Sequence, residues 1–154
     1  KKMILNNVFN TYKPSSMEIG ELDVNNSSKM KDSLELYKYA QSISSSNYYL
    51  LLPPIANFIE AANKKHIRNI SLDTSVSNKY QMGKYNMYLD TTYENIERAL
   101  SSHHNFQSVK LNVSCVNKCP VSNKYIKVST LLDVEKILYS SELEQSIYST
   151  DIVE

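Results

Sequence analysis

The stretch V-K-L-N-V-S-C-V-N-K-C-P, from Val109 to Pro120, joins a strand pattern to a cysteine-bearing loop. Its first half alternates β-branched or aliphatic residues with polar ones, as a half-buried strand does. It then closes on Cys115, three further residues, Cys119 and a proline. In α/β barrels the functional residues lie where strands end and loops begin. The stretch therefore predicts a barrel strand followed by a loop at the functional face.

Similar strand patterns recur along the chain and alternate with helical ones. The predicted strands are residues 16–22, 48–52, 67–76, the stretch from 109, and 146–153. The predicted helices are residues 3–12, 30–43, 55–65, 91–101 and 129–140, and residues 77–90 are predicted to form a loop. Strands alternating with helices predict a parallel sheet built from right-handed crossovers. The expected fold class is α/β, a partial (β/α) TIM barrel of about five parallel strands, with residues 1–154 as a single domain.

Length and charge narrow the class of protein. The chain has 154 residues, whereas a complete eight-stranded barrel needs about 250. The formal net charge is +1, so no overall field favours a nucleic acid or a membrane surface. The longest apolar run, at residues 48–55, is shorter than the roughly 20 residues of a membrane span. We therefore expect neither a nucleic-acid partner nor a membrane partner.

The composition carries two further biases. Asn, Ser, Lys, Ile and Tyr are abundant while arginine occurs only at Arg68 and Arg98, which is typical of an AT-rich genome. Glycine occurs only at Gly20 and Gly83, against about eleven at the average usage of about 7%. Two glycines exclude a glycine-rich nucleotide motif. The 12 tyrosines fit either the codon bias or a contact surface between proteins.

The two cysteines, Cys115 and Cys119, do not complete a tetrahedral metal site, because no second Cys or His pair lies nearby. We predict that Cys115, Cys119 and Pro120 are structural residues that pack at the end of a strand. The three histidines are predicted to lie at the surface. The chain begins Lys-Lys-Met without a signal peptide, so we expect an intracellular protein with reduced thiols.

Two glutamates lie on the first predicted strand. Glu18 and Glu21 are three residues apart, so regular alternation predicts that their side chains take opposite faces of the sheet. This excludes the two residues as an acid/base pair. Glu18 is predicted to lie inside the barrel, where a buried carboxylate needs a partner.

Short motifs in the order and spacing of a known barrel family extend along nearly all of the chain. They are V-S-C at residues 113–115 with C-P at 119–120, S-M-E-I at 16–19, K-M at 29–30, Y-L-L-L-P-P at 49–54, I-S-L-D-T-S-V-S at 70–77, K-Y-N at 84–86 and S-T-D-I at 149–152. On these motifs the chain resembles the middle of 3-hydroxy-3-methylglutaryl-CoA (HMG-CoA) lyase and its metal-dependent TIM-barrel relatives. The resemblance runs from the first helix to the sixth strand of that barrel.

The resemblance implies a lyase that cleaves a carbon–carbon bond of a 3-hydroxy-3-methyl acyl-CoA, with Mg or Mn as the divalent cation. Residue by residue, it implies catalytic roles for Glu18 and Asp151 and substrate binding by Lys84 and Asn86. The family's metal ligands, an aspartate on the first strand, two histidines on the seventh and an asparagine beyond, have no counterpart in this sequence. Metal ligands are therefore expected outside this segment.

The sequence also departs from the family's pattern. Leu52 and Pro54 stand where the family has threonine and asparagine, and Lys118 and Thr150 replace glycines. Two functions consequently stay open: an HMG-CoA lyase-like enzyme that is inactive as this segment alone, and a catalytically silent homologue with a structural or assembly role. In both cases the end strands would have open edges. We expect another chain or a missing barrel segment to cover them, hence an oligomer or a longer polypeptide.

Overall fold

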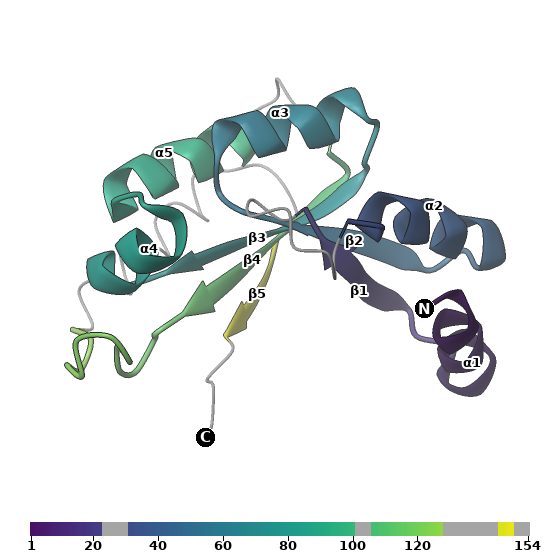
Figure 1. The fold of residues 1–154 in the computed structure, drawn as a ribbon, viewed down its shortest axis with the longest axis horizontal. Helices are drawn as coiled ribbons and strands as arrows, with labels where there is room; N and C mark the ends of the chain where they lie inside the picture. The colour runs from purple at the N-terminus through teal and green to yellow at the C-terminus, as the bar shows by residue number, and fades with distance from the viewer. Residues whose placement is uncertain (23–30, 101–105, 128–144, 150–154) are drawn as a thin grey trace.

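The computed structural model describes residues 1–22, 31–100, 106–127 and 145–149. In these residues one sheet has the strand order β1-β2-β3-β4-β5, and each neighbouring pair is parallel (Figure 1). The strands are β1 (Ser16–Glu21), β2 (Asn47–Leu52), β3 (Asn69–Ser75), β4 (Ser108–Ser114) and β5 (Gln145–Ser149). The helices are α1 (Lys2–Tyr12), α2 (Ser33–Ile43), α3 (Ala56–Lys64), α4 (Asn78–Tyr85) and α5 (Leu89–Leu100). The predicted partial (β/α) barrel is confirmed.

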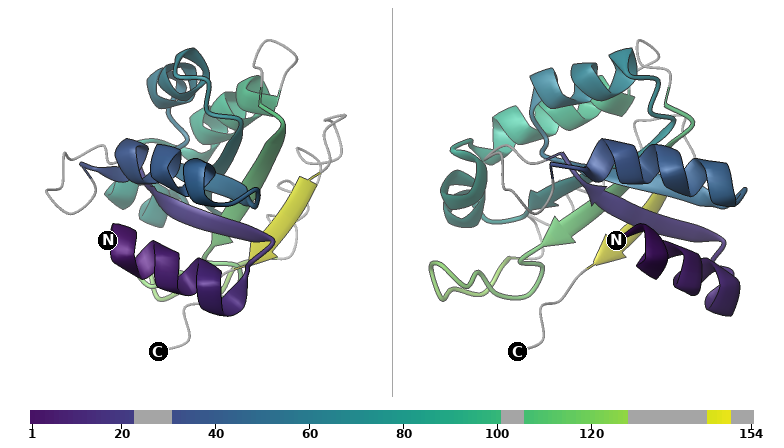
Figure 2. Two further views of the ribbon diagram at one scale, coloured as in Figure 1. Left: turned by 90° about the vertical axis from the view of Figure 1, so that its right-hand side faces the viewer. Right: turned by 45° about the vertical axis from the view of Figure 1, so that its right-hand side comes forward.

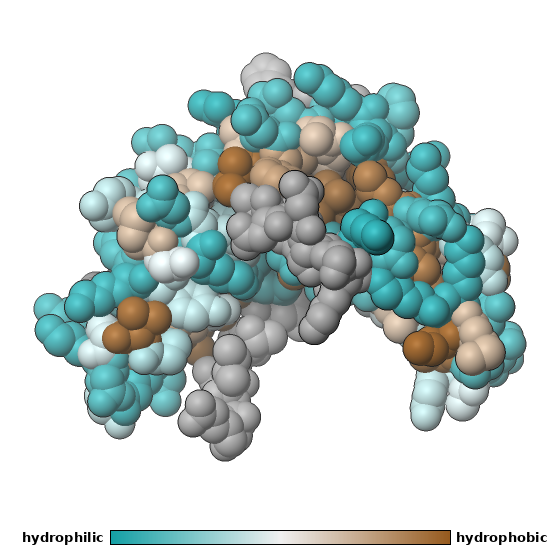
Figure 3. Space-filling view, in the orientation of Figure 1, coloured by the Kyte–Doolittle hydropathy of each residue, from teal (hydrophilic) through white to brown (hydrophobic). Residues whose placement is uncertain are grey.

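The helices lie along one side of the sheet. Figures 1 and 2 show α2, α3 and α5 over its outer side, with α1 beside α2 at the edge formed by β1. Figure 3 shows the molecule arched around a hollow on the other side. Among the described residues, β1 and β5 each have one neighbouring strand, so the sheet is open at both edges as predicted. None of the helices described is long and apolar enough to cross a membrane.

The outer face of the sheet forms the hydrophobic core. Neighbouring strands bring aliphatic residues into common rows, such as Leu50 beside Ile70 and Leu72 beside Leu111. These four side chains are at most 3% exposed. Burial of each contributes about 1.5–3 kcal/mol to folding. Strands of a parallel sheet are commonly buried on both faces, which explains why the apolar run that ends at Leu52 is continuous and does not alternate with polar residues.

The inner face is strongly curved and mostly polar. Lys110 on β4 donates a hydrogen bond across two intervening strands to Ser16 on β1, with a distance of 3.3 Å between Nζ and Oγ. A flat sheet would keep these residues far apart, since neighbouring strands lie about 4.8 Å from each other. The residues of this face include Glu18, Glu21, Tyr49, Leu51, Ser71, Asp73, Ser75, Lys110, Asn112 and Ser114. Branched apolar residues dominate the interior of most TIM barrels, so this face differs from a typical barrel core.

A bulge in β1 overturns the prediction that Glu18 and Glu21 take opposite faces. Glu18 pairs with Tyr49 and Glu21 with Leu51, because the register shifts between Glu18 and Gly20. One extra residue in the strand restores the same face after an odd number of steps. Both carboxylates therefore belong to the inner face. Glu18 is also exposed, not buried as predicted, since the open sheet leaves it accessible to solvent.

The second correction concerns residues 77–90, which were predicted to be a loop. They contain α4 and the start of α5, which begins at Leu89 and not at residue 91. Ser77 caps α4 by accepting a hydrogen bond from the Tyr80 backbone N–H, and Asn86 ends the helix in a left-handed conformation. The helix carries few apolar residues, so its sequence lacks the periodic stripe on which the prediction depended.

The remaining predicted elements agree with the structure to within a few residues at their ends, as element boundaries generally do. Residues 129–140, which were predicted to be helical, lie outside the described residues, as does the end of the last predicted strand. His66 is exposed just after α3, which confirms its predicted surface position. His103 and His104 lie outside the described residues.

Candidate functional site

The carboxyl ends of the strands carry a polar cluster centred on Asp73. Asp73 lies on the inner face of β3 and is 7% exposed. Its Oδ2 atom accepts hydrogen bonds from Lys84 Nζ and from Tyr85 Oη, the latter at 2.5 Å. Both donors come from the last turn of α4. A buried carboxylate needs such partners, and charge-assisted hydrogen bonds are the strongest that side chains form.

The electrostatics of this cluster keep both donors protonated. Burial lowers the pKa of Lys84, but the hydrogen bond to Asp73 and the charge of that carboxylate outweigh it and raise the pKa. Burial and the Asp73 carboxylate together raise the pKa of the Tyr85 hydroxyl above its ordinary value. The charge of Glu21 raises both pKa values further. The cluster can thus donate hydrogen bonds and hold an anionic group beside the Lys84 ammonium.

Helix α4 is fixed against the sheet by a chain of buried polar contacts. Ser75 Oγ donates to Gln81 Oε1 at 3.1 Å, and Gln81 Nε2 donates to Thr92 Oγ1 at 3.1 Å. All three residues, Ser75, Gln81 and Thr92, are 0% exposed. The network joins β3 to α4 and α5. It positions the Asp73 cluster before any ligand arrives, which is how rigid sites are supported.

The loop after β4 begins with Cys115 and then forms a small hairpin that contains Cys119. Lys118 and Tyr125 form an isolated antiparallel bridge, and the Cys119 N–H donates to the Lys124 carbonyl at 2.9 Å. Cys119 is 1% exposed and Cys115 is partly exposed, both as free thiols. Cys119 Sγ accepts hydrogen bonds from Ser77 Oγ at 2.9 Å and from the Ser122 N–H at 3.3 Å. The loop is therefore tied to the start of α4.

A second polar group lies on the inner face around Glu18. Ser71 Oγ donates to Glu18 Oε2 at 2.5 Å, across the intervening strand β2. Lys110 Nζ lies 3.9 Å from the centre of the Tyr49 ring, a cation–π contact. The Tyr49 hydroxyl and the Ser108 hydroxyl are hydrogen-bonded at 2.8 Å. An exposed carboxylate that Ser71 orients and a cation that contacts Tyr49 thus belong to the same face of the sheet.

The predicted site residues fare differently in this arrangement. Lys84 lies in the Asp73 cluster, whereas Asn86 is exposed at the C-cap of α4, two residues further on. Glu18 lies on the inner face, and Asp151 lies outside the described residues. The structure does not test the roles assigned to these side chains, nor the structural role of Cys115, Cys119 and Pro120, and they stay predictions.

Sequence reasoning missed two members of the cluster. Asp73 alternates with Ser71 and Ser75 in β3, and this period of two was a signal for a polar inner face. Tyr85 had no signal of its own, because its contact with Asp73 depends on the unpredicted helix α4.

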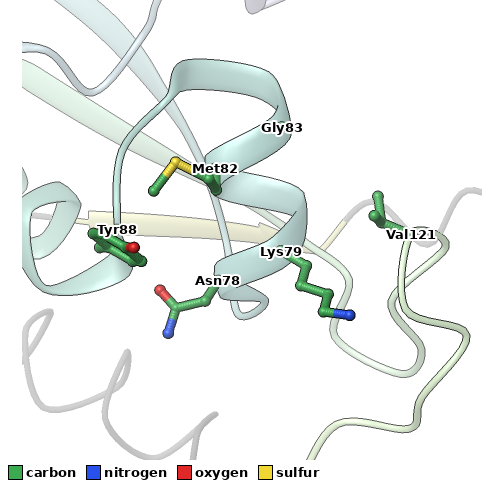
Figure 4. Close-up of a pocket in the computed structure, with 6 residues that line it drawn as sticks. All are labelled: Asn78, Lys79, Met82, Gly83, Tyr88 and Val121. Carbon is green, nitrogen blue, oxygen red and sulfur yellow. The ribbon is translucent and has the colours of Figure 1, made fainter.

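A shallow apolar hollow lies on the outside of α4 and is separate from the Asp73 cluster. It is lined by Asn78, Lys79, Met82, Gly83, Tyr88 and Val121 (Figure 4). The figure shows Asn78, Met82 and Tyr88 together at one side of the helix, with Lys79 and Val121 at the other. The hollow is open to solvent and offers no titratable group besides Lys79 and Tyr88.

The described residues do not fit a metal ion. Among them, no three His, Cys, Asp or Glu side chains gather closely enough to hold one. Asp73 is already occupied by Lys84 and Tyr85, and Glu18 by Ser71. Any metal in the complete protein would need ligands from beyond the part of the chain that the structure describes.

The comparisons with solved structures agree on one fold. The chain is similar to the HMG-CoA lyase of Brucella melitensis, with 20% identity, a TM-score of 0.76, and 94% of this chain and 51% of that one covered. The Bacillus subtilis HMG-CoA lyase is 16% identical, with a TM-score of 0.77, and the match covers 95% of this chain and 49% of that one. An HMG-CoA lyase from Acinetobacter baumannii, solved in complex with coenzyme A and 3-methylmalate, is 15% identical, with a TM-score of 0.79. The match covers 96% of this chain and 48% of that one.

These likenesses show that the chain has the fold of part of an HMG-CoA lyase barrel. It spans about half the length of the structures it matches. No family model matches the sequence, and no curated protein is similar to it in sequence.

Proposed function

We propose that this chain forms one side of the barrel of an HMG-CoA lyase-like enzyme that cleaves a carbon–carbon bond of a 3-hydroxy-3-methyl acyl-CoA. One observation carries the proposal: the fold matches these lyases over 94–96% of the chain. The polar side chains at the carboxyl ends of its strands support it, because barrel chemistry occurs at that face. One of the matched lyases was solved with coenzyme A, which supports an acyl-CoA as the substrate class.

The residues of this chain would bind and orient the substrate. The Lys84 side chain is 38% exposed while Asp73 holds its ammonium, so it can also contact an anionic group of the acyl-CoA. Asn86, two residues along, is exposed on the same segment and would add an amide donor. Glu18, oriented by Ser71, would accept a hydrogen bond from the substrate hydroxyl. The resemblance assigns Asp151 to the same site.

The divalent cation implied by the resemblance, Mg or Mn, would polarise the substrate oxygens when bound. Its ligands would come from a further barrel segment, on the same polypeptide or on another chain. That segment would also cover the open edges at β1 and β5.

A cleavage assay on the full polypeptide tests this function. We expect HMG-CoA to be cleaved with Mg or Mn present, and Glu18→Gln to lower kcat/KM about tenfold or more, since one hydrogen bond to a charged group is lost. Glu60→Gln is the matched control, because Glu60 is an exposed carboxylate on the outer helix α3. Folded protein without activity at saturating metal would reject the proposal.

The alternative, a catalytically silent homologue with a structural or assembly role, has its own support. Leu52 is 0% exposed, and Pro54 is fully buried with its carbonyl accepting from Asn95 at 3.0 Å. Neither residue can replace the polar threonine or asparagine that the family has there. The inactive outcome of the same assay, combined with stable association between this chain and the segment that closes its sheet, would favour this second function.

A further inference from the structure

The hollow on the outside of α4 is formed by that helix together with the hairpin after β4. Its volume is about 380 Å³, within the roughly 300–1,000 Å³ that small-molecule sites occupy. Met82 and Gly83 come from α4, Tyr88 from the segment between α4 and α5, and Val121 from the hairpin. Tyr88 and Val121 are 64% and 61% exposed. The hollow therefore offers an accessible apolar floor with one aromatic ring.

The two segments that form the hollow carry lysines and no acidic residue. Neither residues 77–89 nor residues 115–127 contain Asp or Glu, although the whole chain has 17 basic and 16 acidic residues. Their lysines are all exposed, and Lys84 is the only one with an ion pair in the part of the chain that the structure describes. The other lysines are Lys79, Lys118, Lys124 and Lys127. This local excess of positive charge favours an anionic ligand.

The lysines of both segments lie close to the apolar floor. Lys79 lines the hollow, and Figure 4 shows its side chain extending from α4 on the side of Val121. Lys118 and Lys124 stand three residues before and three residues after Val121. The hairpin is tied to the start of α4, because Ser77 Oγ donates a hydrogen bond to the Cys119 sulfur at 2.9 Å. The fold thus combines ammonium groups from two elements with one apolar floor.

We propose that this hollow binds the nucleotide end of coenzyme A, an inference that rests on the acyl-CoA proposed above as the substrate. That end combines a flat adenine ring with a diphosphate and a ribose 3′-phosphate. The adenine ring lies against Met82 and Tyr88, since every base has a face that stacks on an aromatic side chain. The phosphates lie at Lys79, Lys118 and Lys124, because lysine ammonium groups bind phosphates as point charges.

Helix α4 separates the two ends of such a ligand. Lys84 turns toward Asp73 on the inner face of the sheet, whereas Met82 and Gly83 line the hollow on the outside of the helix. Both α4 and the hairpin follow the carboxyl ends of strands, the face at which barrels bind their ligands. The flexible pantetheine arm connects the acyl group at the inner face with the nucleotide in the hollow.

Binding of coenzyme A and its fragments to the unaltered full polypeptide tests the inference. Calorimetry measures the Kd of coenzyme A, of dephospho-coenzyme A, which lacks the 3′-phosphate, and of pantetheine, which lacks the whole nucleotide. We expect Kd to rise about tenfold for dephospho-coenzyme A and about 100-fold or more for pantetheine. Adenosine 3′,5′-bisphosphate is expected to displace coenzyme A, and inorganic diphosphate to do so much less effectively.

Two substitutions test the hollow by different means. Lys79→Ala removes a charge and should raise the Kd of coenzyme A about tenfold. Gly83→Leu fills the hollow and should raise it by a similar factor. A Cβ atom at Gly83 would meet nothing within 4 Å and leucine favours helices, so we expect this variant to fold. Lys38→Ala, which alters an exposed lysine on α2, is the matched control and should leave the Kd unaltered.

Four results would overturn the inference. They are a full polypeptide that does not bind coenzyme A, pantetheine binding as tightly as coenzyme A, displacement by diphosphate as effective as by the adenosine bisphosphate, and a Kd that either folded variant leaves unaltered. Failure of the proposed function looks different. Coenzyme A bound in the hollow without cleavage of HMG-CoA would reject the catalysis alone, whereas cleavage with an unaltered KM in both variants would reject the hollow alone.

Discussion

Replacing Gly20 with valine is expected to destabilise the protein by about 3 kcal/mol, since overpacking a close contact typically costs about 1–3 kcal/mol or more. A Cβ atom on Gly20 would lie 2.5 Å from Ser33 Oγ and 2.8 Å from Ser33 Cβ. Ser33 starts α2 and is 2% exposed, so it has little room to move. The added methyl groups would push α2 away from β1. Chemical denaturation of the full polypeptide measures the change in the free energy of unfolding.

The other glycine gives the matched control. Gly83 lies inside α4, and a Cβ atom there would meet nothing within 4 Å. Gly83→Ala is therefore expected to stabilise the protein by about 0.5–1 kcal/mol, because alanine loses less backbone entropy in a helix. Equal effects of the two substitutions, or a neutral Gly20→Val, would contradict the close approach of α2 and β1.

The sequence predicted the sheet well because its strands are short apolar or alternating runs between clear helices. It missed α4, whose polar surface gives no stripe, although Ser77 and Asn86 are recognisable cap residues. It could not reveal the bulge in β1, since an inserted residue leaves the composition of a strand unchanged. The bulge places Glu18 and Glu21 on the same inner face. The prediction that they take opposite faces was wrong for this reason.

The site was predictable only in part. The resemblance pointed to Lys84, but not to the residue that holds it, because Asp73 comes from a different element eleven residues earlier. Contacts of this kind depend on how a helix packs against a strand. The same holds for Cys119, whose donors Ser77 and Ser122 come from two separate loops. The motifs therefore indicated the end of the sheet where the site is proposed, whereas the contacts made there depend on packing.

Asp73→Ala is the second substitution with a large expected effect, a loss of about 3 kcal/mol in the free energy of unfolding. Removing one partner of a buried ion pair costs about 3–5 kcal/mol, and the low end applies because Lys84 is partly exposed. Tyr85 also loses its acceptor. Tyr85→Phe removes one hydrogen bond to a charged group and should cost about 1.5 kcal/mol. Asp90→Ala, which alters an exposed aspartate in the first turn of α5, is the control and should cost under about 1 kcal/mol.

The pH dependence separates the ion pair from simple packing. Because the folded-state pKa of Lys84 is raised above its ordinary value of 10.5, its contribution to stability is fully present below about that pH. The contribution is lost as pH rises through the higher folded-state pKa, where the ammonium loses its proton. The stability difference between the unaltered protein and Lys84→Met should therefore stay constant from pH 6 to about pH 9 and shrink at higher pH. A difference that stays constant through high pH would show that the aliphatic stem of Lys84, and not its bond to Asp73, is what stabilises α4.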